Sequence, residues 1–194
     1  MKITTIFTSF ILSLSVYNVV SEPVSITKRL LSDYLFTLHN IRTGFKSWSE
    51  AFPAADRINL IARGYDVYYA CVEGIEMIEP EDPLDHEDTL SLIKGILIVV
   101  DVSESTVSSL ILIKDKVKAL DVTAPLEDLL KKQQSCFYRY SKLLETKVVP
   151  SLGSLVEFLA SRLGTAIQDG IEAFNTTAPP NSTRIFTPSS LTST

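Results

Sequence analysis

The sequence is poor in the residues on which most catalytic and metal sites depend. Its 194 residues include two cysteines and two histidines, His39 and His86. It contains no Gly-x-Ser-x-Gly elbow, His-Glu-x-x-His pair, phosphate-cradling glycine loop or dinucleotide fingerprint. The acidic segment 79–88 lacks the spacing of a calcium loop and is typical of a solvated loop that leads into a helix. These absences predict a non-catalytic protein with no metal and no cofactor.

A surplus of positive charge is also missing. The formal net charge of −5 argues against nucleic acid as a partner and against electrostatic docking to anionic lipid. Cys71 and Cys136 are too few for the disulfide framework of a small stapled domain, so the fold must rest on its hydrophobic core. Because each cysteine lies on the flank of an apolar stripe, two alternatives stay open: a disulfide between them or two buried free thiols.

The two ends of the chain differ in composition from its middle. Residues 1–21 have a basic start, an apolar stretch and small residues before Glu22, which is the pattern of a signal peptide. We therefore expect secretion, with no transmembrane anchor left after cleavage. Residues 175–194 are mostly Ser, Thr, Pro and Asn, which predicts a disordered tail with N-glycosylation at Asn175 and Asn181. The domain itself is expected at 22–174.

Helical periodicity runs through the domain, and no convincing strand is present. Apolar residues three and four positions apart predict five helices, over 25–48, 56–78, 84–120, 124–148 and 152–174. Prolines separate several of these segments, because proline is excluded from helix interiors. Short connections make sequential helices antiparallel neighbours. The predicted fold is all-α, a single five-helix antiparallel bundle.

The segment 84–120 is apolar around more than half of its circumference when it is wound as a helix. Such a helix is expected in the middle of a bundle, in contact with several partners. We expect it to be long and central, with a bend near 101–106. The alternative is a buried hairpin formed by 96–102 and 108–113, because short apolar runs do not distinguish helix from strand by periodicity alone.

The C-terminal half carries a family resemblance. The segments that carry the resemblance are the expected helix 84–120, then 129–137 leading to 144–150 (LETKVVP), and the closing run 163–174, which ends in DGIEAF. With the signal peptide and five helices, the chain resembles the fungal hydrophobic surface-binding protein A and cell wall galactomannoprotein family. The resemblance implies a secreted, glycosylated helical bundle, retained in the wall or released. It also implies binding of lipids or hydrophobic surfaces without catalysis.

We therefore expect an apolar interior that takes up a fatty acid or another apolar ligand. Ser103, Thr106, Tyr65 and Tyr140 are candidate donors to a carboxylate head group. The residues expected to converge on the interior are Leu38, Phe45, Tyr68, Val72, Ile96, Val100, Val107, Leu110, Phe137, Leu144, Leu159 and Leu163.

Three alternatives remain open. The core could be dry and close-packed, with function on the outer surface, where the protein would adsorb to hydrophobic surfaces. The chain could be a helical inhibitor or docking module for another extracellular protein, such as a secreted hydrolase. Pectin-methylesterase inhibitors have a similar size and helicity, but they carry more cysteines. The chain could also be a purely structural cell-wall mannoprotein.

The first testable prediction concerns processing. Val19 and Ser21 are acceptable small residues at positions −3 and −1, so the mature protein should begin at Glu22. N-terminal sequencing or intact-mass measurement of secreted protein checks this. Secreted material that retains residues 1–21 would contradict it.

Overall fold

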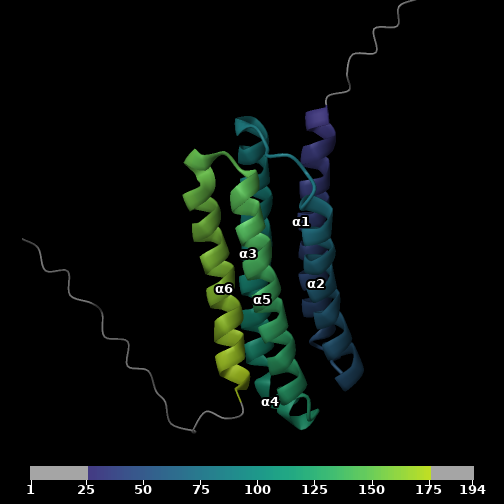
Figure 1. Cartoon of the computed structure of the whole chain (residues 1–194). Helices are drawn as coiled ribbons and strands as arrows, with labels where there is room; N and C mark the ends of the chain where they lie inside the picture. The colour runs from purple at the N-terminus through teal and green to yellow at the C-terminus, as the bar shows by residue number, and fades with distance from the viewer. Residues whose placement is uncertain (1–25, 176–194) are drawn as a thin grey trace, which may run out of the picture.

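Residues 26–175 fold into six α-helices, five of them long. A computed structural model describes residues 26–175, and within that range it contains no strand, so the hairpin alternative is wrong. The expected signal peptide and Asn181 lie outside the described residues, as does the tail beyond Asn175. The elements are α1 (Ile26–Ala51), α2 (Arg57–Ile78), α3 (His86–Leu112), α4 (Lys114–Ala119), α5 (Thr123–Lys147), a 3-10 turn (Pro150–Leu152) and α6 (Gly153–Phe174) (Figure 1).

Two aspartates fix the starts of α2 and α3. The Asp56 carboxylate accepts hydrogen bonds from the backbone N–H groups of Ile58 and Asn59, as expected for an N-cap. The bond from the Asn59 N–H is the main reason why the pKa of Asp56 lies below its ordinary value. Asp85 accepts from the N–H of Asp88 in the same way. These side chains satisfy N–H groups that have no partner within their own helices.

The third helix is shorter than expected. It ends at Leu112, because Ile113 has a non-helical backbone (φ −94°, ψ 17°), and the chain restarts as the short helix α4. The interruption therefore lies at Ile113, whereas 101–106 is continuous helix. The expectation of one helix over 84–120 was therefore wrong, and the helix is interrupted at Ile113.

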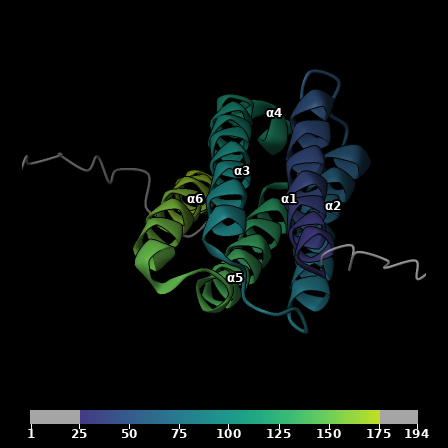
Figure 2. The same cartoon turned by 90° about the horizontal axis from the view of Figure 1, so that it is seen from above.

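The five long helices form a closed ring. Neighbours in contact are α1 with α2, α2 with α5, α5 with α6, α6 with α3, and α3 with α1 (Figure 2). The third helix is thus one wall of the ring, in contact with α1 and α6, and it does not occupy the centre. The expectation of a central helix was wrong because a broad apolar circumference also fits a wall helix whose outer side chains remain exposed, as Leu97 and Ile98 do.

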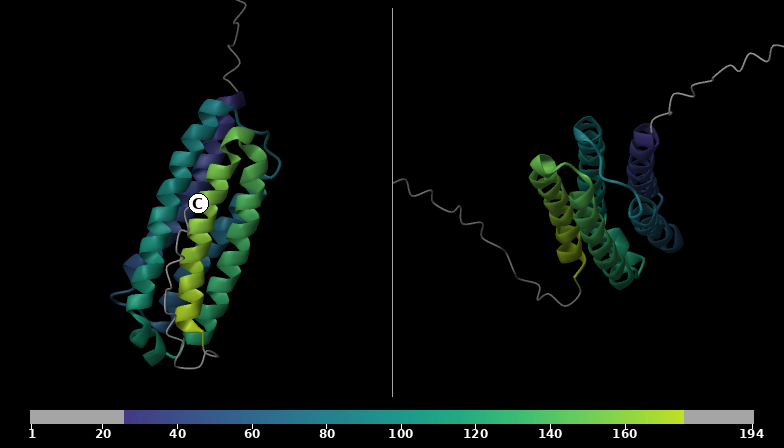
Figure 3. Two further views of the ribbon diagram at one scale, coloured as in Figure 1. Left: turned by 90° about the vertical axis from the view of Figure 1, so that its left-hand side faces the viewer. Right: turned by 45° about the horizontal axis from the view of Figure 1, so that its top comes forward.

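Helices that follow one another in the chain run antiparallel, but several neighbours in the ring do not. Thr106 of α3 faces Phe45 of α1, and Arg162 of α6 faces Glu104 of α3. In each pair a second contact lies further along both helices in the same sense, Leu38 with Gly95 for α1 and α3 and Gly170 with Val107 for α6 and α3, so α1, α3 and α6 are parallel. As a consequence, α1 begins at one end of the bundle and α6 finishes at the other (Figure 3). The expected antiparallel arrangement therefore applies to long helices that are consecutive in the chain, and not to every pair of neighbours in the ring.

Polar contacts hold both ends of the ring. At one end, the Tyr34 hydroxyl donates to the Asp82 carbonyl (3.2 Å), and the Lys147 ammonium donates to the carbonyls of Glu79 and Glu81. At the other end, the ammonium of Lys116 in α4 donates to the carbonyls of Phe52 and Pro53. These contacts fix the connecting segments against neighbouring helices.

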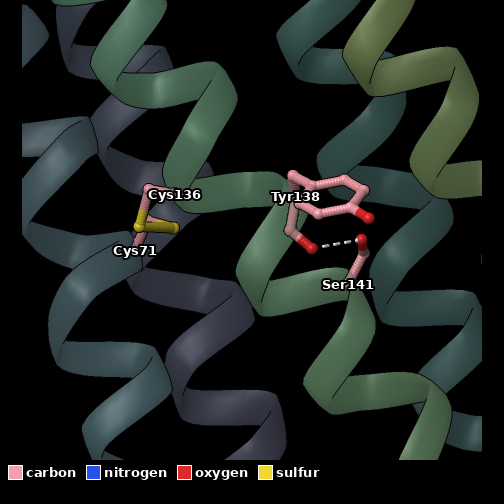
Figure 4. Close-up of a disulfide and its surroundings, with 4 residues drawn as sticks. All are labelled: Cys71, Cys136, Tyr138 and Ser141. Atoms are coloured by element: carbon pink, nitrogen blue, oxygen red, sulfur yellow. Dashed lines mark hydrogen bonds between the residues drawn. A yellow bond between two sulfur atoms is a disulfide. The ribbon is translucent and has the colours of Figure 1, made fainter.

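The α2–α5 contact combines a disulfide with a close approach of the two backbones. Cys71 and Cys136 are bonded, with their Cα atoms 6.3 Å apart (Figure 4). At Gly64, an added Cβ would lie 2.4 Å from Leu129 Cδ2, so a larger residue does not fit there. The Gln133 side-chain amide donates to the Gly64 carbonyl (2.8 Å). The glycine therefore allows α5 to pack directly against the α2 backbone.

The second testable prediction concerns this disulfide. It closes a loop of 65 residues, and the loop-closure entropy of that length corresponds to about 4 kcal/mol. The double substitution Cys71→Ser and Cys136→Ser should lower the free energy of unfolding by about that amount, measured by urea denaturation. Peptide mapping without reductant should recover the two cysteines in one linked species. Quantitative alkylation of both thiols in denatured, unreduced protein would contradict the pairing.

Candidate functional site

The ring encloses a small apolar cavity. Its volume is about 30 Å³, which is room for little more than one water molecule. Six of the expected interior residues lie on its wall: Leu38, Ile96, Val100, Phe137, Leu144 and Leu163. The wall is completed by Ile41, Val99, Tyr140, Ser141, Val156 and Ala160. Side chains from four of the five long helices (α1, α3, α5 and α6) thus meet at one place.

Four other expected interior residues extend the core away from the cavity. Phe45 is fully buried and stacks on Phe137, with ring centroids 5.8 Å apart. Val107, Leu110 and Leu159 are also buried. The apolar interior therefore continues along the bundle axis beyond the cavity itself.

Tyr68 and Val72 lie on the edge of α2. Both are half-buried, whereas the buried residues of α2 are Leu60, Gly64, Val67, Cys71, Gly74, Ile75 and Ile78. The buried face therefore differs from the expected stripe, and Gly64 and Gly74 allow neighbouring helices to approach α2 closely. Tyr68 forms an outer aromatic cluster with Tyr65 and Tyr69. These two expected interior positions are not brought to the cavity.

A hydroxyl pair forms the polar edge of the cavity. Thr37 donates to the Tyr34 carbonyl (2.8 Å), so the bond between the Tyr140 and Thr37 hydroxyls (2.7 Å) uses the Tyr140 hydrogen. Burial raises the pKa of Tyr140 above its usual range, so its hydroxyl stays protonated even at alkaline pH. Of the four expected head-group donors, Tyr140 lines the cavity. Thr37 was missed, although it sits beside Leu38 on the stripe of α1.

The other three expected donors contact backbone carbonyls or lie on the outer surface. Ser103 donates to the Val100 carbonyl (2.7 Å), and Thr106 donates to the Phe45 carbonyl (3.4 Å). Tyr65 lies beside the Lys132 ammonium on the outer face (3.2 Å). Within residues 26–175, no group of three or more His, Cys, Asp or Glu side chains could hold a metal ion.

Two open grooves flank α3. The larger, of about 430 Å³, lies between α3 and α6, where Arg162 pairs with Glu104 (2.7 Å) and Asp101 (3.1 Å). The smaller, of about 170 Å³, lies between α1 and α3, and we name it the α1/α3 groove. Its lining residues are Leu35, Leu38, His39, Arg42, Gly95, Ile98 and Val99.

The outer surface also carries exposed apolar side chains. Among the described residues, α3 is the one helix that is long and apolar enough to cross a membrane, although it packs here as a wall of the bundle. Only 39% of its most apolar window is buried, so much of that apolar surface faces outward. The large exposed apolar residues are Leu35, Phe36, Ile58, Tyr69, Leu90, Leu97, Ile98, Leu112, Tyr138, Leu155 and Phe158.

The third testable prediction concerns the hydroxyl pair. Thr37→Val would leave the buried Tyr140 hydroxyl without its acceptor and should cost about 1–3 kcal/mol of stability, while Tyr140→Phe should cost about 1 kcal/mol. The double variant should be more stable than the sum of the two losses implies, because no unpaired hydroxyl remains. A double-mutant cycle in urea measures this. Additive losses would show that the bond contributes nothing.

Comparison with known proteins places these features in context. No family model matches the sequence. Cell wall mannoprotein 1 of Talaromyces marneffei is 25% identical over 134 residues, which is 69% of this chain and 29% of that protein. The Aspergillus flavus protein of the same name is 23% identical over 125 residues, or 64% of this chain and 46% of that protein. The chain thus spans less than half the length of either relative.

A solved structure extends the likeness to three dimensions. It is ligand binding domain 1 of the Penicillium marneffei MP1 protein, complexed with arachidonic acids. The two structures align with a TM-score of 0.73 and 26% sequence identity, over 75% of this chain and 99% of that domain. The chain is therefore homologous to cell wall mannoprotein 1 and structurally similar to the MP1 ligand-binding domains.

Proposed function

We propose that this chain is a secreted, non-catalytic protein that holds a long-chain fatty acid inside its helical ring. The observation that carries the proposal is the apolar cavity on which Leu38, Val100, Phe137 and Leu163 converge. Support comes from the MP1 domain of the same fold, whose structure contains arachidonic acids. The homologous proteins are cell wall mannoproteins, which supports a location in the fungal wall or outside it.

The size of the cavity means that the ring must expand to admit a ligand. About 30 Å³ cannot hold an acyl chain, so side chains must re-pack and helices must move apart. Burying ten methylene groups would contribute about 8 kcal/mol. That gain must exceed the cost of separating the helices and of immobilising the chain. The closed ring must therefore open before it can hold an acyl chain.

The hydroxyl groups of the interior support binding and do not form a catalytic arrangement. Ser103 and Ser141 donate to backbone carbonyls (2.7 and 2.9 Å), and a nucleophilic serine would instead be paired with a base. Figure 4 shows the Ser141 contact with the Tyr138 carbonyl on the cavity-facing helix α5. The Tyr140 hydroxyl lines the cavity, and it would have to release Thr37 before it could donate to a polar part of a ligand.

A second candidate function is adsorption onto hydrophobic surfaces. The observation that favours it is the outward apolar surface of α3, where Leu90, Leu97 and Ile98 are each at least 41% exposed. Exposed apolar area of this kind marks sites that contact lipid or other apolar surfaces. The two functions differ in stoichiometry, because an interior site saturates at a fixed number of ligands, whereas adsorption does not.

The fourth testable prediction separates these functions. Ala160 lines the cavity, so Ala160→Phe should fill it and weaken binding of arachidonic acid at least about tenfold. The matched control is Ala70→Phe, because Ala70 packs against the core from α2 but does not line the cavity. Isothermal titration calorimetry of the purified domain measures both variants, and circular dichroism checks that each remains folded.

Wild-type protein should bind with saturable stoichiometry, and the control should bind as well as the wild type. Equal binding by folded Ala160→Phe protein would overturn the interior site. Non-saturable uptake by all three proteins would leave surface adsorption as the function.

A further inference from the structure

The α1/α3 groove combines an unpaired cation with apolar walls. Arg42 lies at its edge and forms no ion pair with any described residue. Leu35 and Ile98, both partly exposed, provide apolar surface beside it. A guanidinium next to an apolar channel complements a molecule with one anionic end and an aliphatic body.

The groove and the interior cavity share a wall. Leu38 and Val99 line both spaces, and each is only 4% exposed. Leu38 fills the hollow above Gly95, where an added Cβ would lie 2.8 Å from Leu38 Cδ1. These two side chains therefore separate the outside of the bundle from its interior, and a rotation of either would join the two spaces.

The α1–α3 contact is also the least securely tied in the ring. Its cross-link among the described residues is the Thr106–Phe45 hydrogen bond, which is long (3.4 Å) and lies about two turns from Leu38. At Leu38 the contact is apolar. The other four helix contacts have shorter or covalent links. A disulfide joins α2 with α5, and the Arg162 ion pairs join α3 with α6. Trp48 donates to the Leu60 carbonyl (2.8 Å) between α1 and α2, and Gln134 donates to Gln168 (3.0 Å) between α5 and α6.

We infer that a non-esterified long-chain fatty acid enters the ring between α1 and α3. Its acyl chain passes between Leu38 and Val99, and its carboxylate stays in the groove, where Arg42 binds it. The inference rests on the proposed function and adds the entrance, the residues that close it and the head-group ligand. It commits to a free carboxylate, because Arg42 is a cation and the route beyond it is apolar.

The head-group assignment is tested by comparing two ligands with the same acyl chain, one with a charged carboxylate and one with an uncharged methyl ester. Arg42→Gln should weaken binding of arachidonic acid about two- to fivefold, the range for an exposed ion pair, and leave binding of its methyl ester unchanged. Arg139→Gln is the matched control, since Arg139 is an exposed arginine of α5 that does not line the groove. Displacement of a fluorescent acyl probe from the full domain gives all the affinities.

The outcomes of this comparison are distinct. No saturable binding of either ligand by the wild type would overturn the proposed function itself. Saturable wild-type binding with an acid affinity unaffected by Arg42→Gln would overturn the role of Arg42 alone. An equal loss for acid and ester would also overturn it, because the uncharged ester cannot form an ion pair with Arg42.

The entrance is tested by association kinetics. Leu38→Ala should raise the association rate for arachidonic acid at least about threefold, because it removes the side chain that closes the seam. Leu144→Ala is the matched control: it deletes the same atoms from the same cavity, but on α5, away from the groove. Stopped-flow fluorescence measures both, and Val99→Ala, a smaller truncation of the other closing side chain, repeats the test. Equal rates for Leu38→Ala, Val99→Ala and Leu144→Ala would overturn the entrance.

Discussion

Five amphipathic helices must bury their apolar stripes against one shared interior, and the rest of the structure depends on that constraint. None of the stripes can be covered by a single partner, so the helices close into a ring in which each contacts two neighbours. A ring of this kind has an inside that must be filled by side chains alone. Leu38, Val100, Phe137 and Leu163 are among the side chains that fill it, and a cavity of about 30 Å³ remains. The potential binding site is therefore a by-product of how the helices bury their apolar surface.

The ring is not equally firm around its circumference. A disulfide joins α2 with α5, and an ion pair joins α3 with α6. Separating α3 from α6 would leave Arg162 without its charged partner. Across α1 and α3 near Leu38, the described residues meet through apolar contact, and such contacts re-form without a fixed geometry. Local opening is expected where ties are fewest. Expansion of the ring can thus be confined to one seam while the disulfide-linked side keeps its packing.

Sequence periodicity predicted the helices well, and it predicted their arrangement less well. Stripe spacing and the Asp56 cap identified α1, α2, α5 and α6 to within a few residues, because these are local properties. The order of helices around the ring depends on contacts between distant segments, such as Arg162 with Glu104, which no local pattern encodes. Six of twelve expected interior residues line the cavity. Tyr68 and Val72 do not, because side-chain size was a poor guide to which face of α2 packs inward.

The outward apolar surface of α3 and the interior site have a common origin. A helix that forms one wall of an expandable ring needs apolar side chains toward the cavity, toward both neighbours and along any surface uncovered as a seam opens. For α3 these requirements cover most of its circumference, which explains why Ile98 borders the α1/α3 groove while Val99 and Val100 face the cavity. In a rigid bundle the exposed positions of α3 would tolerate polar residues at no cost. Their apolar character is consistent with a wall that moves against α1.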